Sequence, residues 1–410
     1  MIDRLRNLSL ATWMLIAILA GLALGFLAPD VARQTAIVST IFLRLIKSII
    51  APVMFGVLVT AVTGAGTLRD IGRLGWKSVL YFESATSIAL LIGWCAVAIA
   101  QPGRGVALPA QTAARADVPS FATVVERAFP SSIFDAMARG DVLEIVVFCL
   151  LFGLACHSVG AKARPVVAFA EAVGAIAFKY TSFVMYLAPF AVCAAMASTV
   201  ADGGGDSLKA LAKFVVVAWV AQILYMVVVL GGSLLAAGMP FGRFIDHARK
   251  PFLVAFATTS SAAALPQTLE CLENMGIPKR IVGIVAPLSI TFNMSGSSIH
   301  LAMCALFAAQ AAGMHLPLSE QALILLTLKL TSKGVAGIPR ANFVILTGLF
   351  AMFSLPLAVL PMLLGIDAVV DMIRTSVNVL GHCVAGPVIA RWEGIRLKDE
   401  PAGITQPVAA

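Results

Sequence analysis

Long apolar stretches dominate this chain and limit what it can fold into. An α-helix needs about 20 mostly apolar residues to cross the hydrocarbon core of a bilayer. Only 12% of the 410 residues are charged, whereas a soluble domain carries about a quarter. The sequence therefore predicts an all-α polytopic membrane protein. The predicted spans lie near residues 9–28, 35–64, 77–101, 142–160, 172–201, 208–238, 281–312 and 355–390.

The shortage of charge excludes several classes of protein. A nucleic-acid binder needs a dense basic face, so we expect no nucleic-acid partner despite the formal net charge of +8. The seven cysteines form no CxxC pair and lack histidines at zinc-ligand spacing, so neither a disulfide framework nor a bound metal or other cofactor is expected. The HExxH and GxSxG motifs are absent, and we do not expect an enzyme.

Basic residues indicate the orientation of the spans. Arg4 and Arg6 precede the first apolar stretch, which is long for a signal peptide and lacks a good cleavage site, so we interpret it as a span. Cytoplasmic loops are enriched in Lys and Arg. With the N-terminus inside, the basic clusters near 69–77, 162–164 and 243–250 also fall inside. We expect a multi-pass inner-membrane protein with both termini in the cytoplasm.

Two further apolar segments are interrupted in the middle. Segment 251–278 is broken by Thr258-Thr259-Ser260-Ser261 and has basic pairs on both sides, so a full crossing would put one pair outside. Segment 318–352 is broken by Thr331-Ser332-Lys333-Gly334. We interpret both as re-entrant helical hairpins, which gives eight spans plus two hairpins. Irregular backbone at membrane depth survives only where protein or a water-filled cavity surrounds it.

The two hairpins also resemble each other as an inverted repeat. Each is followed by a span that contains Asn-x-x-Gly, at Asn293–Gly296 and at Asn378–Gly381. Inverted repeats with interrupted helices point to the binding site of a secondary transporter. The alternative is that the small residues only permit close helix packing.

The last span carries a polar stripe. At about 100° per residue its polar side chains fall within one arc of the helix. A charge at the bilayer centre costs at least about 2.5 kcal/mol, so the stripe is expected to face a polar site inside the protein. A purely structural Asp–Arg pair is the alternative interpretation. The stripe consists of Asp367, Asp371, Arg374, Thr375, Asn378 and His382.

These motifs resemble those of the dicarboxylate/amino acid:cation symporter family, which includes the glutamate transporters. The similarity covers nearly the whole chain and is most specific in TTSSAAALP, FNMSGSS, SKGVAGIPRANF and DMIRTSVNVLGH. The resemblance implies a homotrimer in which a transport domain moves across the membrane like an elevator beside a fixed scaffold. On that basis we expect scaffold helices in 1–76, the third span in 77–101, an extracellular loop in 102–141, scaffold helices and the sixth span in 142–241, a transport core in 242–398 and a cytoplasmic tail in 399–410.

The resemblance also implies substrate contacts. Asp371 would bind the α-amino group and Arg374 the side-chain carboxylate of an acidic amino acid, glutamate or aspartate. A guanidinium fork suits a carboxylate, and an aspartate suits an ammonium. The remaining expected substrate-binding residues are Ser260, Ser261, Ser297, Ile338, Asp367, Thr375 and Asn378.

The chain departs from the sodium-coupled members at two carboxylates. Their seventh span reads Asn-Met-Asp-Gly-Thr, where this chain has Ser295, and their second sodium-binding Asp corresponds to His382. Sodium prefers oxygen ligands, so proton coupling in the manner of the proton-coupled bacterial branch is predicted. His382 titrates near neutral pH as a free side chain and is one candidate carrier. The other coupling-ion candidates are Asn293, Ser295, His300, Asn378 and Glu83.

Several alternatives stay open at this level. His382 and His300 are equally compatible with neutral imidazoles in a polar cavity, and Glu83 with a simple pair to Lys77. Arg340 is compatible with a second carboxylate contact or with exposure to water. Within transport, the alternatives are a C4-dicarboxylate carrier and a sodium-coupled or uncoupled member of the same family.

Overall fold

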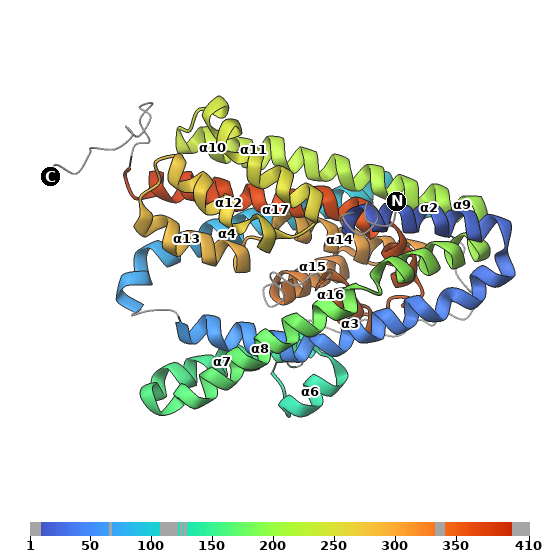
Figure 1. The fold of residues 1–410 in the computed structure, drawn as a ribbon, viewed down its shortest axis with the longest axis horizontal. Coiled ribbons are helices and arrows are strands. Elements are labelled where there is room, and N and C mark those ends of the chain that lie inside the picture. Colours follow the sequence, from blue (N-terminus) through green and yellow to red (C-terminus); the bar gives the residue numbers. More distant parts are fainter. Residues whose placement is uncertain are drawn as a thin grey trace, which may run out of the picture.

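The computed structural model describes residues 10–64, 68–106, 122–123, 126, 129–332 and 341–395. Every regular element in these ranges is helical (Figure 1). In chain order the elements are α2 (Leu10–Leu27), α3 (Pro29–Gly64), α4 (Leu68–Ala100), α6 (Ile133–Arg139), α7 (Val142–Val159), η2 (Gly160–Ala163), α8 (Arg164–Met185), α9 (Ala188–Leu224), η3 (Tyr225–Leu230), α10 (Gly231–Ala237), α11 (Phe241–Thr258), α12 (Ser261–Asn274), α13 (Lys279–Phe292), α14 (Ser295–Ala311), α15 (Leu318–Thr331), α16 (Ala341–Met352) and α17 (Val359–Trp392).

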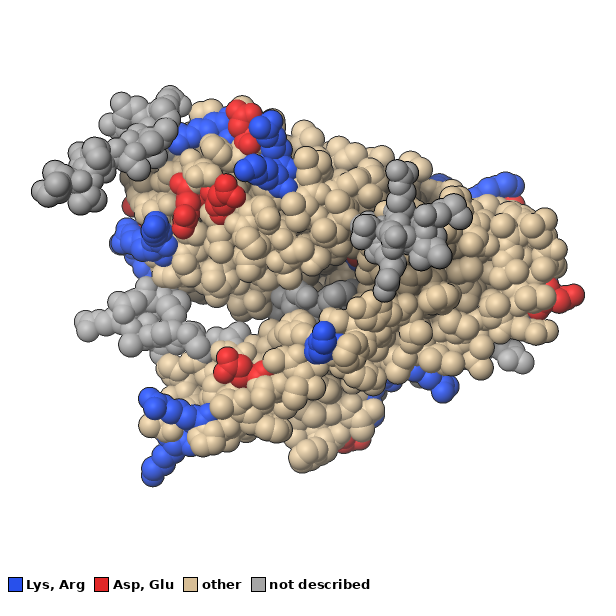
Figure 2. Space-filling view, viewed as in Figure 1, with Lys and Arg blue, Asp and Glu red and all other residues tan. Residues whose placement is uncertain are grey.

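Length and hydropathy make many of these helices suitable for a membrane. Figure 2 shows most of the charged side chains near the left end of the bundle and fewer at the right end, with a largely uncharged surface between them. Large apolar side chains such as Leu19, Ile99 and Val227 are more than half exposed on that surface. Six helical segments in the described ranges can cross a membrane by length and composition: Leu10–Leu27, Pro29–Thr60, Gly72–Ala100, Val142–Met185, Ala188–Ala237 and Lys279–Ala311.

The helices form two packed groups. Figure 1 shows α3, α7 and α8 along the lower side and α11, α12 and α17 above them, with α2 lying beside α9. One group contains α2, α3, α7 and α8, and α9 joins it by packing on α2 and α3. The other contains α4 and α11 to α14 around α17. In the first group Gly56 of α3 faces Gly174 of α8, where a β-carbon on Gly56 would collide with the Gly174 backbone. Such small residues allow membrane helices to approach closely.

Helices α14 and α17 lie at the centre of the second group. Nearly every residue of both is buried, including the polar ones. A helix buried around its whole circumference can carry charge, provided that neighbouring helices supply partners. The predicted polar stripe therefore faces protein and not the bundle surface.

Helix boundaries differ from the sequence prediction in two of the predicted spans. The predicted span 281–312 is broken into α13 and α14 at Asn293 and Met294. The predicted span 172–201 consists of the end of α8 and the start of α9, which meet at Tyr186-Leu187. The break that the sequence predicts between the spans 172–201 and 208–238 does occur: the glycine run there is a kink between two helices that share the label α9. Only Gly204 leaves helical geometry there, with φ 57° and ψ −149°, because a residue without a β-carbon can make the bend alone.

Candidate functional site

The first broken segment forms two packed helices with a short irregular tip. Helix α11 ends at Thr258, Thr259 has the left-handed φ of 51°, and α12 begins at Ser261. Ser260 is extended, and its Oγ accepts a hydrogen bond from the backbone N–H of Ala263 at 3.2 Å. Serine and threonine favour such caps because their hydroxyls replace missing helical hydrogen bonds. The tip thus follows from the Thr-Thr-Ser-Ser sequence.

Another break, within the predicted span 281–312, separates α13 from α14 at Asn293 and Met294, whose backbone angles are non-helical. Asn378 of α17 caps the start of α14, where the backbone N–H groups have no partner within the helix. Its Oδ1 accepts hydrogen bonds from the N–H groups of Gly296 at 2.8 Å and Ser297 at 3.3 Å. Its Nδ2 donates to Ser297 Oγ at 3.1 Å. Gly296 lies against the Arg374 carbonyl, where any β-carbon would collide with that oxygen. This contact places the start of α14 directly beside Arg374.

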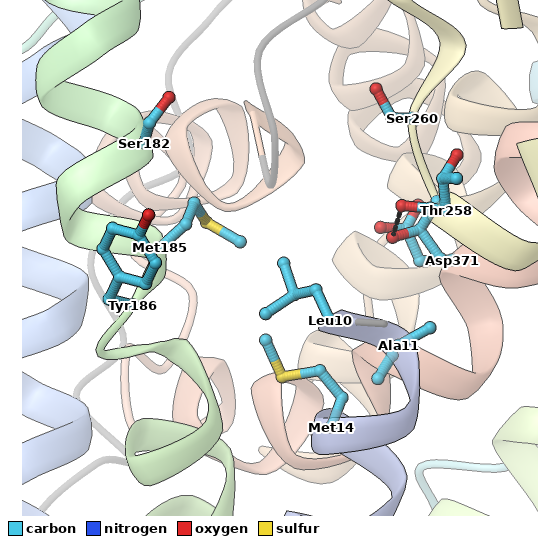
Figure 3. A pocket seen from close by; sticks show the side chains of 11 residues that line it. Leu10, Ala11, Met14, Ser182, Met185, Tyr186, Thr258, Ser260 and Asp371 are labelled. Atoms are coloured by element: carbon cyan, nitrogen blue, oxygen red, sulfur yellow. Dashed lines mark hydrogen bonds between the residues drawn. The ribbon is translucent and has the colours of Figure 1, made fainter. Parts of the chain in front are cut away.

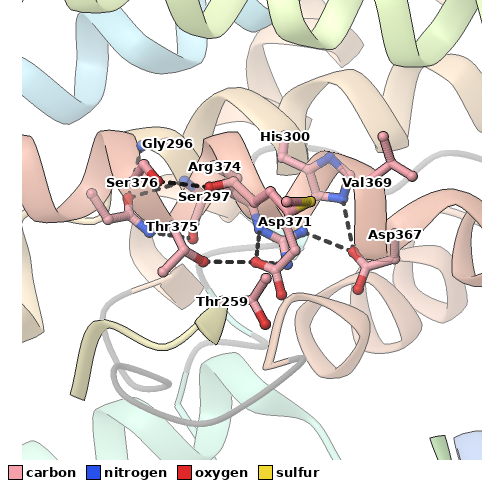
Figure 4. A network of polar contacts seen from close by, with 12 residues as sticks. Thr259, Gly296, Ser297, His300, Asp367, Val369, Asp371, Arg374, Thr375 and Ser376 are labelled. Atoms are coloured by element: carbon pink, nitrogen blue, oxygen red, sulfur yellow. Dashed lines mark hydrogen bonds and ion pairs between the residues drawn. The ribbon is translucent and has the colours of Figure 1, made fainter. Parts of the chain in front are cut away.

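Arg374 is held by two carboxylates of its own helix (Figure 4). Its Nη1 donates to Asp367 Oδ1 at 2.9 Å, and its Nε donates to Asp371 Oδ1 at 3.0 Å. Thr375 Oγ1 also donates to Asp371 Oδ1, at 2.8 Å. Asp367, Asp371 and Arg374 are 0%, 8% and 3% exposed. The site therefore contains a buried guanidinium already paired with two carboxylates.

His300 of α14 lies behind this cluster. Its Nε2 is 3.8 Å from Asp367 Oδ1 and 3.3 Å from the Cys304 sulfur. The ring packs edge-on against Phe214 of α9, with centroids 6.0 Å apart. The packing of α14 on α17 therefore places His300 beside Asp367.

Two residues of the sixth span reach the break between α13 and α14. Tyr225 OH donates to Ser295 Oγ at 2.8 Å, and Ser295 Oγ donates to Asn293 Oδ1 at 3.0 Å. Gln222 Nε2 donates to the Gly296 carbonyl at 2.8 Å. Sequence reasoning missed both residues, although a glutamine and a tyrosine within so apolar a segment were a usable signal. Tyr225 opens the six-residue π-helix η3, a geometry often found at functional sites.

His382 is buried without a polar contact. Its side chain is 1% exposed, and neither ring nitrogen has a hydrogen-bond partner among the described residues. The Nδ2 atom of Asn293 likewise has no hydrogen-bond partner among the described residues. Buried polar atoms of this kind cost free energy unless another group or water meets them.

Glu83 pairs with a different lysine from the one anticipated. Lys329 Nζ of α15 lies 3.4 Å from Glu83 Oε2 and donates to Ser87 Oγ at 2.7 Å. Lys77 instead donates to Glu393 Oε1 at 2.7 Å, and Arg73 also binds that carboxylate. Hydrogen bonds from Arg73 and Lys77 lower the pKa of Glu393, which lies just past α17, to about 2. The suggested Glu83–Lys77 pair is thus corrected, because the helix packing brings other partners closer.

A cavity of about 300 Å³ opens between the two helix groups beside Asp371 (Figure 3). Thr258, Thr259 and Ser260 line one side together with Asp371. The start of α2 and the end of α8 line the other side, with mostly apolar residues. Ser261 begins α12 next to this tip. Ile338 and Arg340 lie outside the described residues. Within the part of the chain that the structure describes, no three His, Cys, Asp or Glu side chains are grouped so that they could hold a metal ion.

Broken helices that enclose buried charge inside an apolar bundle define a polytopic membrane transport protein. The profile of the sodium:dicarboxylate symporter family matches residues 10–392. The chain belongs to this family, and it is a transporter and not an enzyme.

Individual relatives carry two kinds of name. The chain is 35% identical to the proton/sodium-glutamate symport protein of Geobacillus stearothermophilus, over 95% of this chain and 96% of the relative. It is 34% identical to the protein of the same name from Bacillus caldotenax, with the same coverage. It is also 34% identical to a C4-dicarboxylate transport protein of Pseudomonas syringae pv. syringae, over 94% and 88% of the two chains.

Proposed function

We propose that this symporter carries acidic amino acids, glutamate or aspartate. The observation that supports the substrate is the charge of the buried site. Arg374 is accompanied by both Asp367 and Asp371, so the described site has an excess of negative charge. An acidic amino acid complements both signs, because its ammonium group suits Asp371 while its side-chain carboxylate suits Arg374.

Substrate binding requires Arg374 to change partners. The substrate carboxylate replaces Asp371 as a partner of the Arg374 guanidinium. The substrate ammonium group then pairs with the freed Asp371 carboxylate. Asp367 keeps Arg374 in place during the exchange. Thr375, Asn378 and Ser297 orient the substrate from α14 and α17, and Ser260 and Ser261 do so from the first hairpin tip. For Ile338, which lies outside the described residues, a substrate contact stays a proposal.

A second candidate substrate is a C4-dicarboxylate. The names of several relatives favour it, including the Pseudomonas syringae protein. Two substrate carboxylates would need a second cation, whereas Asp371 would repel one of them. The described charges therefore favour the amino acid.

We propose the proton as the coupling ion. Ser295 supplies a hydroxyl where a carboxylate would bind sodium, and that hydroxyl is already engaged by Tyr225 and Asn293. His382 is an imidazole with two unpartnered nitrogens. It is the first candidate for the proton, and His300 beside Asp367 is the second. The Glu83 carboxylate is a weaker candidate because Lys329 lies against it.

The proposed architecture is eight spans with two re-entrant hairpins of opposite orientation. The group formed by α2, α3, α7 and α8 is the scaffold, and the group around α17 is the transport core. Gln222 and Tyr225 bind α14, so the second half of the sixth span moves with the core. We further propose a homotrimer in the inner membrane with both termini in the cytoplasm.

Reconstituted vesicles test substrate and coupling together. With labelled aspartate or glutamate, an imposed pH gradient should drive accumulation, and a sodium gradient should not. Sodium-driven uptake that ignores pH would reject proton coupling and leave the substrate standing. Succinate that competes with aspartate at equal or lower concentration would favour the dicarboxylate. Binding without accumulation under either gradient would indicate an uncoupled carrier.

A further inference from the structure

A second cavity lies away from the substrate site, between α4, the sixth span and the end of α17. Its volume is about 260 Å³. Apolar residues line most of it, among them Ile88 and Val229. The polar lining comes from Tyr81, Ser84, Ser233 and Arg391. The cavity therefore combines an apolar wall with one cation and three hydroxyl groups.

The cavity also contains a buried phenol. Tyr81 is 7% exposed, and its OH makes no hydrogen bond of ordinary geometry among the described residues. Ser233 lies beside it; the Ser233 Oγ donates to the Val229 carbonyl at 2.7 Å and can still accept from the phenol. A buried phenol is normally hydrogen-bonded, and the Tyr81 OH can bind Ser233 or a group that occupies the cavity.

Arg391 is the cation available to that group. Glu393 binds both Arg73 and Lys77 nearby, and its side chain is only 2% exposed. Arg391 has no ion pair within the part of the chain that the structure describes, and it lines the cavity. A guanidinium fork matches the oxygens of a phosphate group better than an ammonium does.

The surroundings of the cavity are those of a membrane surface. Trp392 packs edge-on against Tyr81, with ring centroids 6.1 Å apart, and is 43% exposed. Trp76 is 67% exposed. Exposed tryptophans are typical of the interface between lipid and water. Beyond them, Ile88, Leu91 and Val228 expose apolar surface, on which an acyl chain can lie.

We infer that this cavity binds the phosphate of an anionic phospholipid, with Arg391 and Tyr81 on the phosphate and an acyl chain along Ile88 and Val229. Basic pockets between membrane helices are suited to such headgroups. The site joins α4, the sixth span and the end of α17 at residues to which the proposed function assigns no substrate contact. A bound lipid would hold the end of α17 to α4 and the sixth span. The inference requires a membrane-spanning chain but not the proposed substrate.

Lipid binding to the purified full chain is the test. Native mass spectrometry would compare phosphatidylglycerol with phosphatidylcholine for the wild type and for Arg391→Gln, Tyr81→Phe and Arg249→Gln. Arg249 is the matched control, because it is exposed on α11 and does not line the cavity. A basic residue at a membrane surface contributes about fivefold in affinity, so Arg391→Gln should weaken phosphatidylglycerol binding by about that factor or more. Tyr81→Phe should weaken it less, and Arg249→Gln should not change it.

Three results would overturn the inference. The wild type could bind both lipids equally, or Arg391→Gln and Arg249→Gln could weaken phosphatidylglycerol to the same extent, as general surface charge would produce. Release of the lipid by millimolar inorganic phosphate would indicate a site for free anions and not for lipid. Thermal unfolding of each variant checks that the fold is retained. If Arg391→Gln does not fold, the test rests on Tyr81→Phe alone. Unchanged phosphatidylglycerol binding by Tyr81→Phe would then reject the site.

Discussion

Arg374 Nη1 and Asp367 Oδ1 are joined by a 2.9 Å hydrogen bond between two residues of α17 that are almost completely buried. The pair lies two helical turns apart along one face, and Asp371 binds the same guanidinium from the turn between them. The substrate carboxylate must therefore compete with internal carboxylates for Arg374. This competition makes binding depend on the charge of the substrate.

Arg374→Cys should abolish uptake of acidic amino acids while some uptake of neutral amino acids remains. The substitution removes the only described cation in the cluster, yet it leaves Asp371 for the ammonium group. Labelled aspartate and serine in reconstituted vesicles provide the measurement. Arg249→Cys, on the exposed surface of α11, is the control and should retain aspartate uptake. Unchanged aspartate uptake in Arg374→Cys would refute the role assigned to Arg374.

Asn378→Ala should destabilise the protein by about 1 kcal/mol or more, because a helix N-cap contributes about that much. Its Oδ1 accepts two backbone hydrogen bonds at the start of α14. The thermal midpoint in detergent would measure the loss. Equal midpoints for Asn378→Ala and the wild type would show that the cap contributes nothing.

Tyr225→Phe and Ser295→Ala should be strongly non-additive. Each removes one side of the 2.8 Å hydrogen bond between η3 and α14 and leaves the other polar group buried. Leaving a buried polar atom unsatisfied costs about 1–3 kcal/mol, whereas removing both atoms costs less than the sum. A double-mutant cycle on unfolding would give the coupling free energy. Additive effects would mean that the two hydroxyls do not interact.

Glu83→Gln and Lys329→Gln should couple by about 0.2–1 kcal/mol, the range of a partly exposed ion pair. Their side chains are 31% and 30% exposed, which keeps the contribution small. Glu83→Gln combined with Lys77→Gln is the matched comparison and should be additive. Coupling to Lys77 instead of Lys329 would contradict the observed pairing of α4 with α15.

Glu393→Gln should destabilise the contact between α4 and α17 equally at pH 5, 6.5 and 8. Its pKa is lowered to about 2 from 4.5, so its stabilising effect is complete above the unfolded value of 4.5 and is lost progressively as the pH falls from 4.5 to about 2. The difference in thermal midpoint between wild type and variant is the measurement. A difference that shrinks between pH 8 and pH 5 would mean that the Glu393 pKa is not depressed.

The sequence could predict the features that depend on a single helix: its span, its breaks and the face on which its polar residues lie. The apolar stretches identified the membrane class, because the length of a span is set by the thickness of the bilayer. The Thr-Thr-Ser-Ser run located the break between α11 and α12. The shared face of Asp367, Asp371 and Arg374 followed from helical periodicity alone, since residues three, four and seven apart lie on the same side.

Contacts between distant helices needed the tertiary structure. Tyr225 reaches Ser295, Lys329 reaches Glu83 and Asn378 caps α14 only because the packing of α4, α9, α14 and α17 fixes their relative depth and rotation. Sequence spacing does not define those quantities. The apolar pattern of this chain determined which segments cross the membrane, and packing decided which polar groups meet inside it. A polar side chain buried away from water needs a partner, and in these three contacts the partner is supplied by a neighbouring helix.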